Sequence, residues 1–259
     1  MTTSQPSAFV DAAHDDSHVR PFVYDADGKR ALHYSICTIQ SRADLVQPDC
    51  LDLQYTRLMM GFLLLLPRPA RLAMIGLGGG SLLRFCRRHL PATSLCVVEN
   101  NPHVLSLRDQ FMVPPDDERL RIVQADGARF MRDGSETFDV LLLDGYDAFG
   151  LPRALSTQSY FDHCARRLGA DGVLVMNLHA QEAREARILE RIRRSFGGVV
   201  LPVYDSERSN CIAFACHGSA LRTLRLGPLQ RPQGLDAEVW SSLQGDLARV
   251  LGAWREEFA

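Results

Sequence analysis

The stretch Ala73-Met-Ile-Gly-Leu-Gly-Gly-Gly-Ser-Leu-Leu-Arg84 decides the fold predicted for this chain of 259 residues. An apolar run stops at a glycine cluster, Gly76, Gly78, Gly79 and Gly80, and a helical pattern of apolar residues begins directly afterwards. Glycines in such a strand-to-helix turn let a ligand lie against bare backbone, near the positive end of the helix. The stretch therefore predicts a nucleotide site, although a glycine-rich turn by itself could be an ordinary tight turn.

Glu99 is the second part of this signal. It ends the next predicted strand, 94–99. An acidic residue about 20 residues after the glycines is the usual partner of the ribose hydroxyls in folds of this kind. The combination of the two features favours a nucleotide site over a plain turn.

The composition is typical of a soluble globular protein, with 46% hydrophobic and 23% charged residues and a formal net charge of -2. Such a charge gives no support for nucleic acid or a membrane surface as a partner. The seven cysteines form no CxxC pair and no zinc-like spacing, so we expect reduced thiols and no metal. The N-terminus lacks the pattern of a signal peptide, and we predict a cytoplasmic protein.

Changes in composition divide the chain into four predicted parts. Residues 1–17 are expected to be a disordered tail, and residues 18–53 a small N-terminal β domain. Residues 54–218 are expected to form a Rossmann-like, nucleoside-binding catalytic domain. Residues 219–259 are expected to be a linker followed by an amphipathic helix.

The predicted N-terminal domain contains a hairpin. The turn signal Asp25-Ala-Asp-Gly28 joins strands expected at 21–24 and 31–39, and a further short strand is expected at 51–53. An isolated hairpin is not stable in water. We therefore expect it to pack on the main domain or on a neighbouring subunit.

Strands and helices alternate through the main domain after a predicted helix at 55–65. Strands are expected at 71–76, 94–99, 120–124, 138–143, 172–178, 199–203 and 210–216. Helices are expected at 80–89, 102–110, 127–132, 157–168 and 181–196. Apolar strands that alternate with helices predict a doubly wound, mostly parallel seven-stranded sheet with both faces covered. The last two strands leave no room for a helix between them, so they form an antiparallel hairpin, which favours an S-adenosylmethionine-dependent transferase over a dinucleotide dehydrogenase.

Acidic residues also follow the third and fourth strands of this sheet, as Asp126-Gly127 and as Asp144 and Asp147. Ligands bind at the carboxyl ends of the strands in an open α/β sheet. Asp126 could accept a hydrogen bond from the adenine amine, and Glu99 from both ribose hydroxyls. Asp144 and Asp147 could attract a cationic amine, and one of them could take its proton. Alternatively, Asp126 only caps the next helix and Asp144 only stabilises a turn.

From about Pro21 to Gly218 the chain resembles the spermidine synthase (polyamine aminopropyltransferase) family. The resemblance rests on Leu53–Met59, Gly76–Ser81, Val97–Glu99, Gln124–Met131, Phe138–Asp147 and Leu201–Tyr204. It implies transfer of an aminopropyl group from decarboxylated S-adenosylmethionine to putrescine or a related amine, without a metal. We expect the protein to be a homodimer and its substrate to be a small-molecule amine.

The resemblance also implies a role for each candidate residue. Asp144 would be the catalytic base, and Asp147 would help to hold the donor or the acceptor amine. Tyr55 would lie over the donor, and Tyr204 would orient the acceptor unless it is only a core tyrosine. The donor would be bound by Gly76, Gly78, Gly79, Gly80, Glu99, Asp126 and Gly127.

Four positions depart from the family pattern. Gly79 stands where the family has an aspartate that binds the amino group of the aminopropyl chain, and Asn100 replaces an acid. Thr56 and Arg57 replace the family's Gln/His-Glu pair. These changes weaken the polyamine side of the site and leave two alternatives open: a methyltransferase that uses intact S-adenosylmethionine, or a catalytically weak nucleoside-binding homologue.

Overall fold

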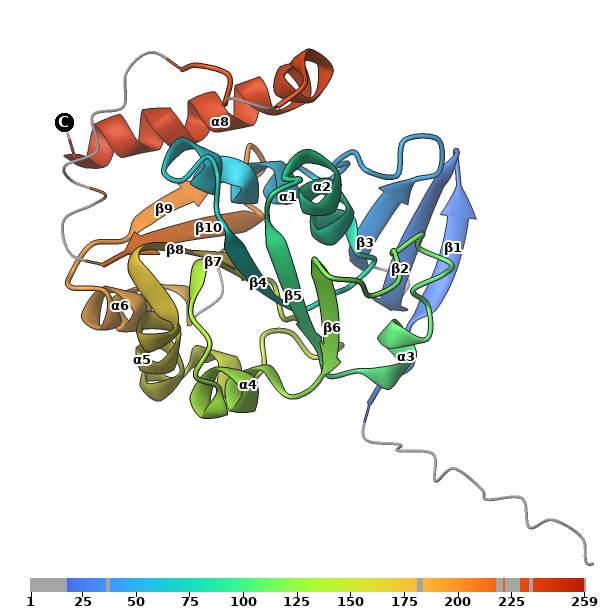
Figure 1. The fold of residues 1–259 in the computed structure, drawn as a ribbon, viewed down its shortest axis with the longest axis horizontal. Helices are drawn as coiled ribbons and strands as arrows, with labels where there is room; N and C mark the ends of the chain where they lie inside the picture. The colour runs from blue at the N-terminus through green and yellow to red at the C-terminus, as the bar shows by residue number, and fades with distance from the viewer. Residues whose placement is uncertain are drawn as a thin grey trace, which may run out of the picture.

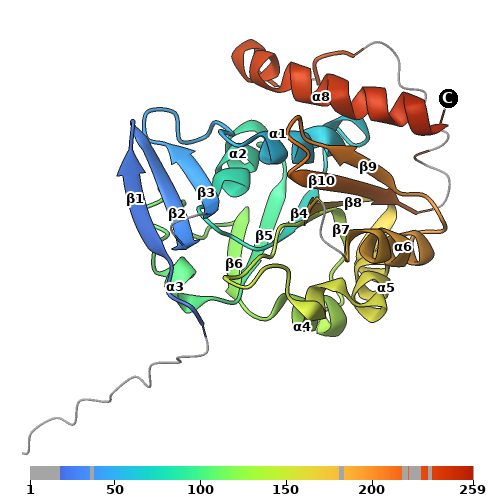
Figure 2. The same ribbon diagram turned by 180° about the vertical axis from the view of Figure 1, so that it is seen from behind.

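The computed structural model describes residues 18–35, 38–180, 184–217, 221, 229–232 and 235–258, which form two sheets flanked by helices (Figures 1 and 2). The predicted disordered tail, 1–17, and most of the predicted linker lie outside the described residues.

The N-terminal sheet has three antiparallel strands, β1 (Phe22–Ala26), β2 (Lys29–Ser35) and β3 (Thr38–Asp44). The predicted strand 31–39 is therefore split between β2 and β3, while Ile36 and Cys37 lie outside the described residues. The strand expected at 51–53 is absent. Asp52 instead binds Lys29 and Arg42 through its carboxylate, so side chains rather than a backbone ladder attach this segment to the sheet.

The main sheet has the strand order β6-β5-β4-β7-β8-β10-β9. Its strands are β4 (Arg71–Ile75), β5 (Ser94–Glu99), β6 (Leu120–Gln124), β7 (Phe138–Leu143), β8 (Leu168–His179), β9 (Leu201–Tyr204) and β10 (Asn210–Cys216). The pairs from β6 to β8 are parallel, and β10 is antiparallel to both of its neighbours. The predicted seven-stranded, doubly wound sheet with a terminal antiparallel hairpin is thus confirmed.

Helices cover both faces of this sheet (Figures 1 and 2). They are α1 (Gln54–Met59), continued by the 3-10 turn η1 (Met60–Leu64), α2 (Ser81–His89), α3 (Pro102–Leu105), α4 (Gly127–Asp133), η2 (Arg153–Ser156), α5 (Gln158–Arg167), α6 (Glu185–Ser195) and α8 (Ala237–Phe258). One core packs α1, α2 and α8 on one face, and a second core packs α4, α5 and α6 on the other. Leu32 and Ala43 of the N-terminal sheet belong to the first core, so that sheet packs on the main domain of the same chain.

Several element bounds differ from the prediction. The helix expected at 102–110 is the single turn α3, because the chain then turns back and buries Phe111 and Val113. The helix expected from residue 80 begins at Ser81, since Gly80 has the left-handed φ of +70°. The first part of the helix expected at 181–196 lies outside the described residues, and α6 begins at Glu185.

Arg84 of α2 joins three segments that surround the glycine turn. Its side chain is 3% exposed and donates to the carbonyls of Pro48 (2.8 Å), Gly79 (2.6 Å) and Phe111 (2.5 Å). Burial lowers the pKa of this guanidinium to about 10, so it remains charged at neutral pH. The side chain therefore holds the N-terminal domain against the glycine turn.

We predict that Arg84→Met lowers the free energy of unfolding by about 3 kcal/mol, because buried carbonyls lose charged donors. Urea unfolding followed by circular dichroism measures this. The control is Arg121→Met, which removes a side chain that is 57% exposed and pairs with Glu136. An exposed pair of this kind contributes about 0–1 kcal/mol. Equal losses in the two variants would contradict the role given to Arg84.

Candidate active site

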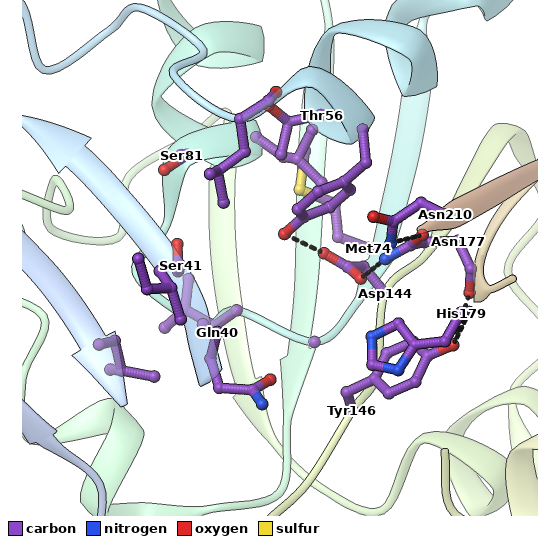
Figure 3. A pocket seen from close by; sticks show the side chains of 18 of the residues that line it. Gln40, Ser41, Thr56, Met74, Ser81, Asp144, Tyr146, Asn177, His179 and Asn210 are labelled. Atoms are coloured by element: carbon purple, nitrogen blue, oxygen red, sulfur yellow. Dashed lines mark hydrogen bonds between the residues drawn. The ribbon is translucent and has the colours of Figure 1, made fainter. Parts of the chain in front are cut away.

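A cavity of about 590 Å³ lies at the carboxyl ends of the central strands, between the main sheet and the N-terminal sheet (Figure 3). Gln40 and Ser41 of β3 form part of its wall, together with Met74 of β4 and Asp144, which directly follows β7. Residues of both sheets therefore build the cavity together.

Glycine is required at the turn after β4 because backbones meet there. Gly76 has a φ of +100°, and a Cβ atom at this position would lie 2.3 Å from the backbone oxygen of Asp144. Gly78 (φ +52°) also lines the cavity, whereas Gly80 (φ +70°) precedes α2. A Cβ at Gly79 would lie 2.8 Å from Ser41 Oγ, so this residue faces the N-terminal sheet and is not part of the cavity lining.

Glu99 connects the turns that follow β4 and β5. Its Oε2 accepts from the backbone N–H of Leu77 (2.9 Å), and its Oε1 accepts from that of Asn101 (2.8 Å). The side chain is 8% exposed and lines the cavity. Each carboxylate oxygen can accept a second hydrogen bond, so Glu99 can hold the glycine turn and a ligand at once.

A smaller adjoining cavity, of about 50 Å³, contains the other predicted acids. Asp126, Gly127 and Asp147 line it, and it shares Gly76 and Glu99 with the larger cavity. Asp126 Oδ1 caps α4 by accepting from the N–H of Arg129 (2.8 Å), as the alternative interpretation expected. Asp147 Oδ1 accepts from the N–H of Phe149 (2.7 Å). Asp147 thus lies beside Asp126 and not in the larger cavity with Asp144.

Asp144 receives two side-chain hydrogen bonds in the larger cavity. Tyr55 Oη donates to Oδ2 (3.2 Å), and Asn177 Nδ2 donates to Oδ1 (2.8 Å). Asn210 Nδ2 in turn donates to Asn177 Oδ1 (2.9 Å), which fixes the orientation of that amide (Figure 3). The carboxylate is therefore held from two sides, by α1 and by the β8–β10 pair.

Burial raises the pKa of the Asp144 carboxyl above its ordinary value. The hydrogen bonds from Asn177 and Tyr55 and the charge of His179 lower this pKa but do not cancel the effect of burial. Burial and the nearby Asp144 charge raise the pKa of Tyr55 well above its usual value, so the phenol stays neutral and acts as a donor. A carboxyl with a raised pKa is a better proton acceptor than an exposed one.

An aromatic pair lies next to Asp144. The rings of Tyr146 and His179 stack at 4.1 Å with an interplanar angle of 22°. Tyr146 Oη accepts from the N–H of His179 (2.9 Å) and donates to the carbonyl of Asn177 (3.3 Å). Sequence reasoning missed this pair and the two asparagines. The signal for Asn177 was a polar residue inside an otherwise apolar strand, Val173–Leu178.

Tyr204 does not line this cavity, and the acceptor-orienting role expected for it stays a prediction. Its hydroxyl donates to Glu185 Oε1 of α6 (2.6 Å), and the Arg208 guanidinium lies 4.6 Å from its ring centre. Tyr204 ends the edge strand β9, where alternation turns its side chain toward α6. Tyr204 lines a separate surface depression, together with residues of α8.

Within the part of the chain that the structure describes, no three His, Cys, Asp or Glu side chains are arranged to hold a metal ion. None of the helices in these ranges is long and apolar enough to cross a bilayer.

A sequence model of the spermine/spermidine synthase domain matches residues 52–204. The chain belongs to this family. The match includes the glycine turn and the acids after β5, β6 and β7.

The chain is similar to bacterial polyamine aminopropyltransferases. The chain is 37% identical over 187 residues to a polyamine aminopropyltransferase of Chromobacterium violaceum, covering 72% of each protein. It is 35% identical over 192 residues to a polyamine aminopropyltransferase of Neisseria meningitidis serogroup A, covering 73% of each.

Solved structures show the same fold at low sequence identity. A probable spermidine synthase from Corynebacterium glutamicum has a TM-score of 0.65 and 18% identity, covering 87% of this chain and 91% of the other. A spermidine synthase in complex with the transition-state analogue AdoDATO has a TM-score of 0.57 and 20% identity, covering 87% of this chain and 88% of the other.

We predict that Asp144→Asn makes the folded protein more stable at pH 7. The folded-state pKa of Asp144 lies above its unfolded value, so wild type loses stability as pH rises from about 4 through the folded pKa. Asparagine does not ionise, and its amide fits the same space. Urea unfolding between pH 3 and 8 should show a gain that vanishes below about pH 3.

The control is Asp133→Asn, because the exposed Arg132 lowers the pKa of Asp133. This variant should change stability at neutral pH in the opposite direction, and only slightly. A loss of stability at pH 7 in Asp144→Asn would show that burial of the charged Asp144 carboxylate does not destabilise the folded protein.

Proposed function

We propose that this protein transfers an aminopropyl group from decarboxylated S-adenosylmethionine to putrescine or a related amine. The observation that carries the proposal is the cluster around Asp144: a buried carboxylate with a raised pKa, in the same cavity as the glycine turn and Glu99. The family of the chain, with relatives named polyamine aminopropyltransferase, supports this reaction over others on the same fold.

The donor's adenosine fits the glycine-turn side of the site. Gly76 and Gly78 leave backbone open to the cavity, and Glu99 has lone pairs left for ribose hydroxyls. Asp126 and Gly127 line the adjoining small cavity, where the adenine amine would meet the Asp126 carboxylate. The sulfonium would then lie between Glu99 and Asp144, two carboxylates that favour a cation.

Asp144 would act as the base. An aliphatic amine is protonated at pH 7 and has no free lone pair until it loses a proton. Asp144 takes that proton, and the amine nitrogen attacks the aminopropyl carbon bound to sulfur. The carbon–sulfur bond breaks, and its electron pair stays on sulfur, which leaves as neutral methylthioadenosine. Tyr55 and Asn177 hold the carboxylate in place for this step.

The role of Asp147 in this reaction differs from that of Asp144. Its position beside Asp126 in the smaller cavity supports contact with the donor rather than with the acceptor amine.

The homodimer and the cytoplasmic location also belong to this proposal. The exposed aromatic side chains Phe22 and Tyr24, on the edge strand β1, support an association between copies.

A second candidate function is methyl transfer from intact S-adenosylmethionine, and Gly79 favours it. The acid that would bind the ammonium group of an aminopropyl chain is missing there. The nearest wall, on β3, contributes the neutral side chains of Gln40 and Ser41.

We predict that Asp144→Asn lowers turnover at least about a hundredfold, since a positioned general base contributes 10²–10⁴ in rate. Affinity for methylthioadenosine should stay within a few-fold of wild type. The measurement is chromatography of methylthioadenosine and the extended amine between pH 6 and 9, with calorimetry for binding. The matched control is Asp126→Asn, which should weaken nucleoside binding and affect turnover less at saturating donor.

Two results would reject this proposal. If wild type forms neither product from common diamines, it is not an aminopropyltransferase. If Asp144→Asn turns over as fast as wild type, Asp144 is not the base.

We also predict that wild type prefers the decarboxylated donor over intact S-adenosylmethionine by less than about a hundredfold in kcat/KM. The preference is small because position 79 has no carboxylate, and a hydrogen bond to a charged group is worth about 1.5–3 kcal/mol. Competition kinetics with both donors test this. Gly79→Asp should shift the preference toward the decarboxylated donor. Gly79→Ala is its control, because it adds a side chain at this position without adding a charge. A preference far above a hundredfold would mean that another acid binds the ammonium group.

A further inference from the structure

The first turn of α1 is tied to two distant parts of the chain through Gln54. Its Nε2 donates to Asp246 Oδ1 of α8 (2.7 Å). Its Oε1 accepts from both the backbone N–H (3.0 Å) and the hydroxyl (2.6 Å) of Ser206, in the turn between β9 and β10. Gln54 thus connects three segments that lie side by side beside the cavity (Figures 1 and 2).

Both segments that Gln54 reaches are held by further hydrogen bonds, although Ser206 itself is exposed. Asp246 is 8% exposed, and its Oδ2 accepts from Arg57 Nε (2.6 Å). In the β9–β10 turn, Asp205 is 6% exposed and accepts from the N–H (2.7 Å) and hydroxyl (2.6 Å) of Ser209 and from the N–H of Asn210 (3.1 Å). Gln54 therefore joins two rigid anchors.

From each anchored segment a chain of hydrogen bonds runs to Asp144. Tyr55, the next residue of α1, donates to Oδ2. Asn210, which ends the turn, donates to Asn177, and Asn177 donates to Oδ1. The two side-chain donors of the carboxylate thus depend on the two segments that Gln54 links.

We propose that Gln54 is a positioning residue that sets the geometry of Asp144 by holding α1 and the β9–β10 turn at a fixed separation. Gln54 is outside the cavity lining and acts through Tyr55 and Asn210. The inference rests on the proposed role of Asp144 as the base.

Loss of the Gln54 amide would have two linked effects. The Tyr55 and Asn177 bonds to Asp144 would loosen, and a misplacement of about 1 Å can reduce a rate by up to about a hundredfold. The carboxylate would also lose donors that favour its charged form, so its pKa would rise. The acidic limb of the pH–rate profile would then move to higher pH.

The chain offers a matched control in Gln158. Its Nε2 also bridges two helices, donating to Asp162 Oδ1 of α5 (3.0 Å) and Ser195 Oγ at the end of α6 (2.8 Å). Both glutamines are half-buried, and neither lines the cavities described above. Gln158 Oε1 is buried with no hydrogen-bond partner among the described residues, whereas Gln54 Oε1 accepts two bonds. Each Leu variant still removes a side-chain bridge between two segments, and only the Gln54 bridge leads to Asp144.

The experiment compares these two variants in kcat, KM and pH–rate profile, with thermal unfolding as the check on folding. Gln54→Leu should lower kcat about tenfold or more, move the acidic limb upward and leave methylthioadenosine affinity unchanged. Gln158→Leu should keep the wild-type kcat and profile, whatever stability it loses. Equal kinetics in the two variants would overturn the proposal.

A double-mutant cycle separates positioning from a general loss of stability. In a Tyr55→Phe background the effect of Gln54→Leu should shrink, because one of its two routes to Asp144 is already broken. Full additivity would mean that Gln54 does not act through Tyr55. If Gln54→Leu fails to fold, two other variants are tested in the same way. Ser206→Ala removes the hydroxyl bond to Gln54 and keeps the backbone one, and Asp246→Ala removes the acceptor of Gln54 Nε2.

A readout without turnover keeps this test apart from that of the proposed function. Carbon-13 NMR titration of the aspartate carboxyls, assigned with Asp144→Asn, follows the Asp144 pKa directly. Gln54→Leu should raise it and Gln158→Leu should not, whichever reaction the enzyme performs. An unchanged Asp144 pKa in Gln54→Leu would reject the positioning role even if the aminopropyltransferase assay succeeds.

Discussion

The close approach of two backbones at the ends of β4 and β7 is the constraint on which this site depends. The backbone N–H of Gly76 donates to the carbonyl of Val98 (2.8 Å). The backbone N–H of Asp144 donates to the carbonyl of Ile75 (2.9 Å). No Cβ fits between Gly76 and the Asp144 carbonyl. The glycine turn and the carboxylate are therefore neighbours because adjacent parallel strands place them so, and a ligand on the turn lies next to Asp144.

The Asp144 site lowers the stability of the folded protein and at the same time makes the carboxylate a better proton acceptor. A buried carboxylate is costly when charged, and here its pKa is raised in spite of two donors. The structure compensates with neutral partners, Tyr55 and Asn177, rather than with a guanidinium, which would hold the pKa low. A carboxyl held in this way accepts a proton more readily than an exposed one.

Two of the four departures from the family pattern, Gly79 and Arg57, have local physical explanations. At Gly79, a side chain would meet Ser41 and the ring of Phe111, so the space that an acid would need is filled. Arg57, which stands where the family has an acid, pairs with Asp246 of α8 and donates to two backbone carbonyls before α1. That pairing connects the C-terminal helix to the turn that carries Tyr55, and so to the cavity.

The sequence by itself determined the order of strands and helices, the glycine turn and the acids after β5, β6 and β7, because these follow from local periodicity and from residues next to one another in the chain. It did not determine the partners of Asp144. Asn177, Asn210 and Tyr55 come from segments far apart in the sequence. The strand order, with β10 between β8 and β9, brings the two asparagines together, and the packing of α1 on β8 and β10 adds Tyr55. The same long-range packing decided that Tyr204 faces α6 instead of the cavity, since a side chain on an edge strand can turn to either face and the local sequence does not choose between them.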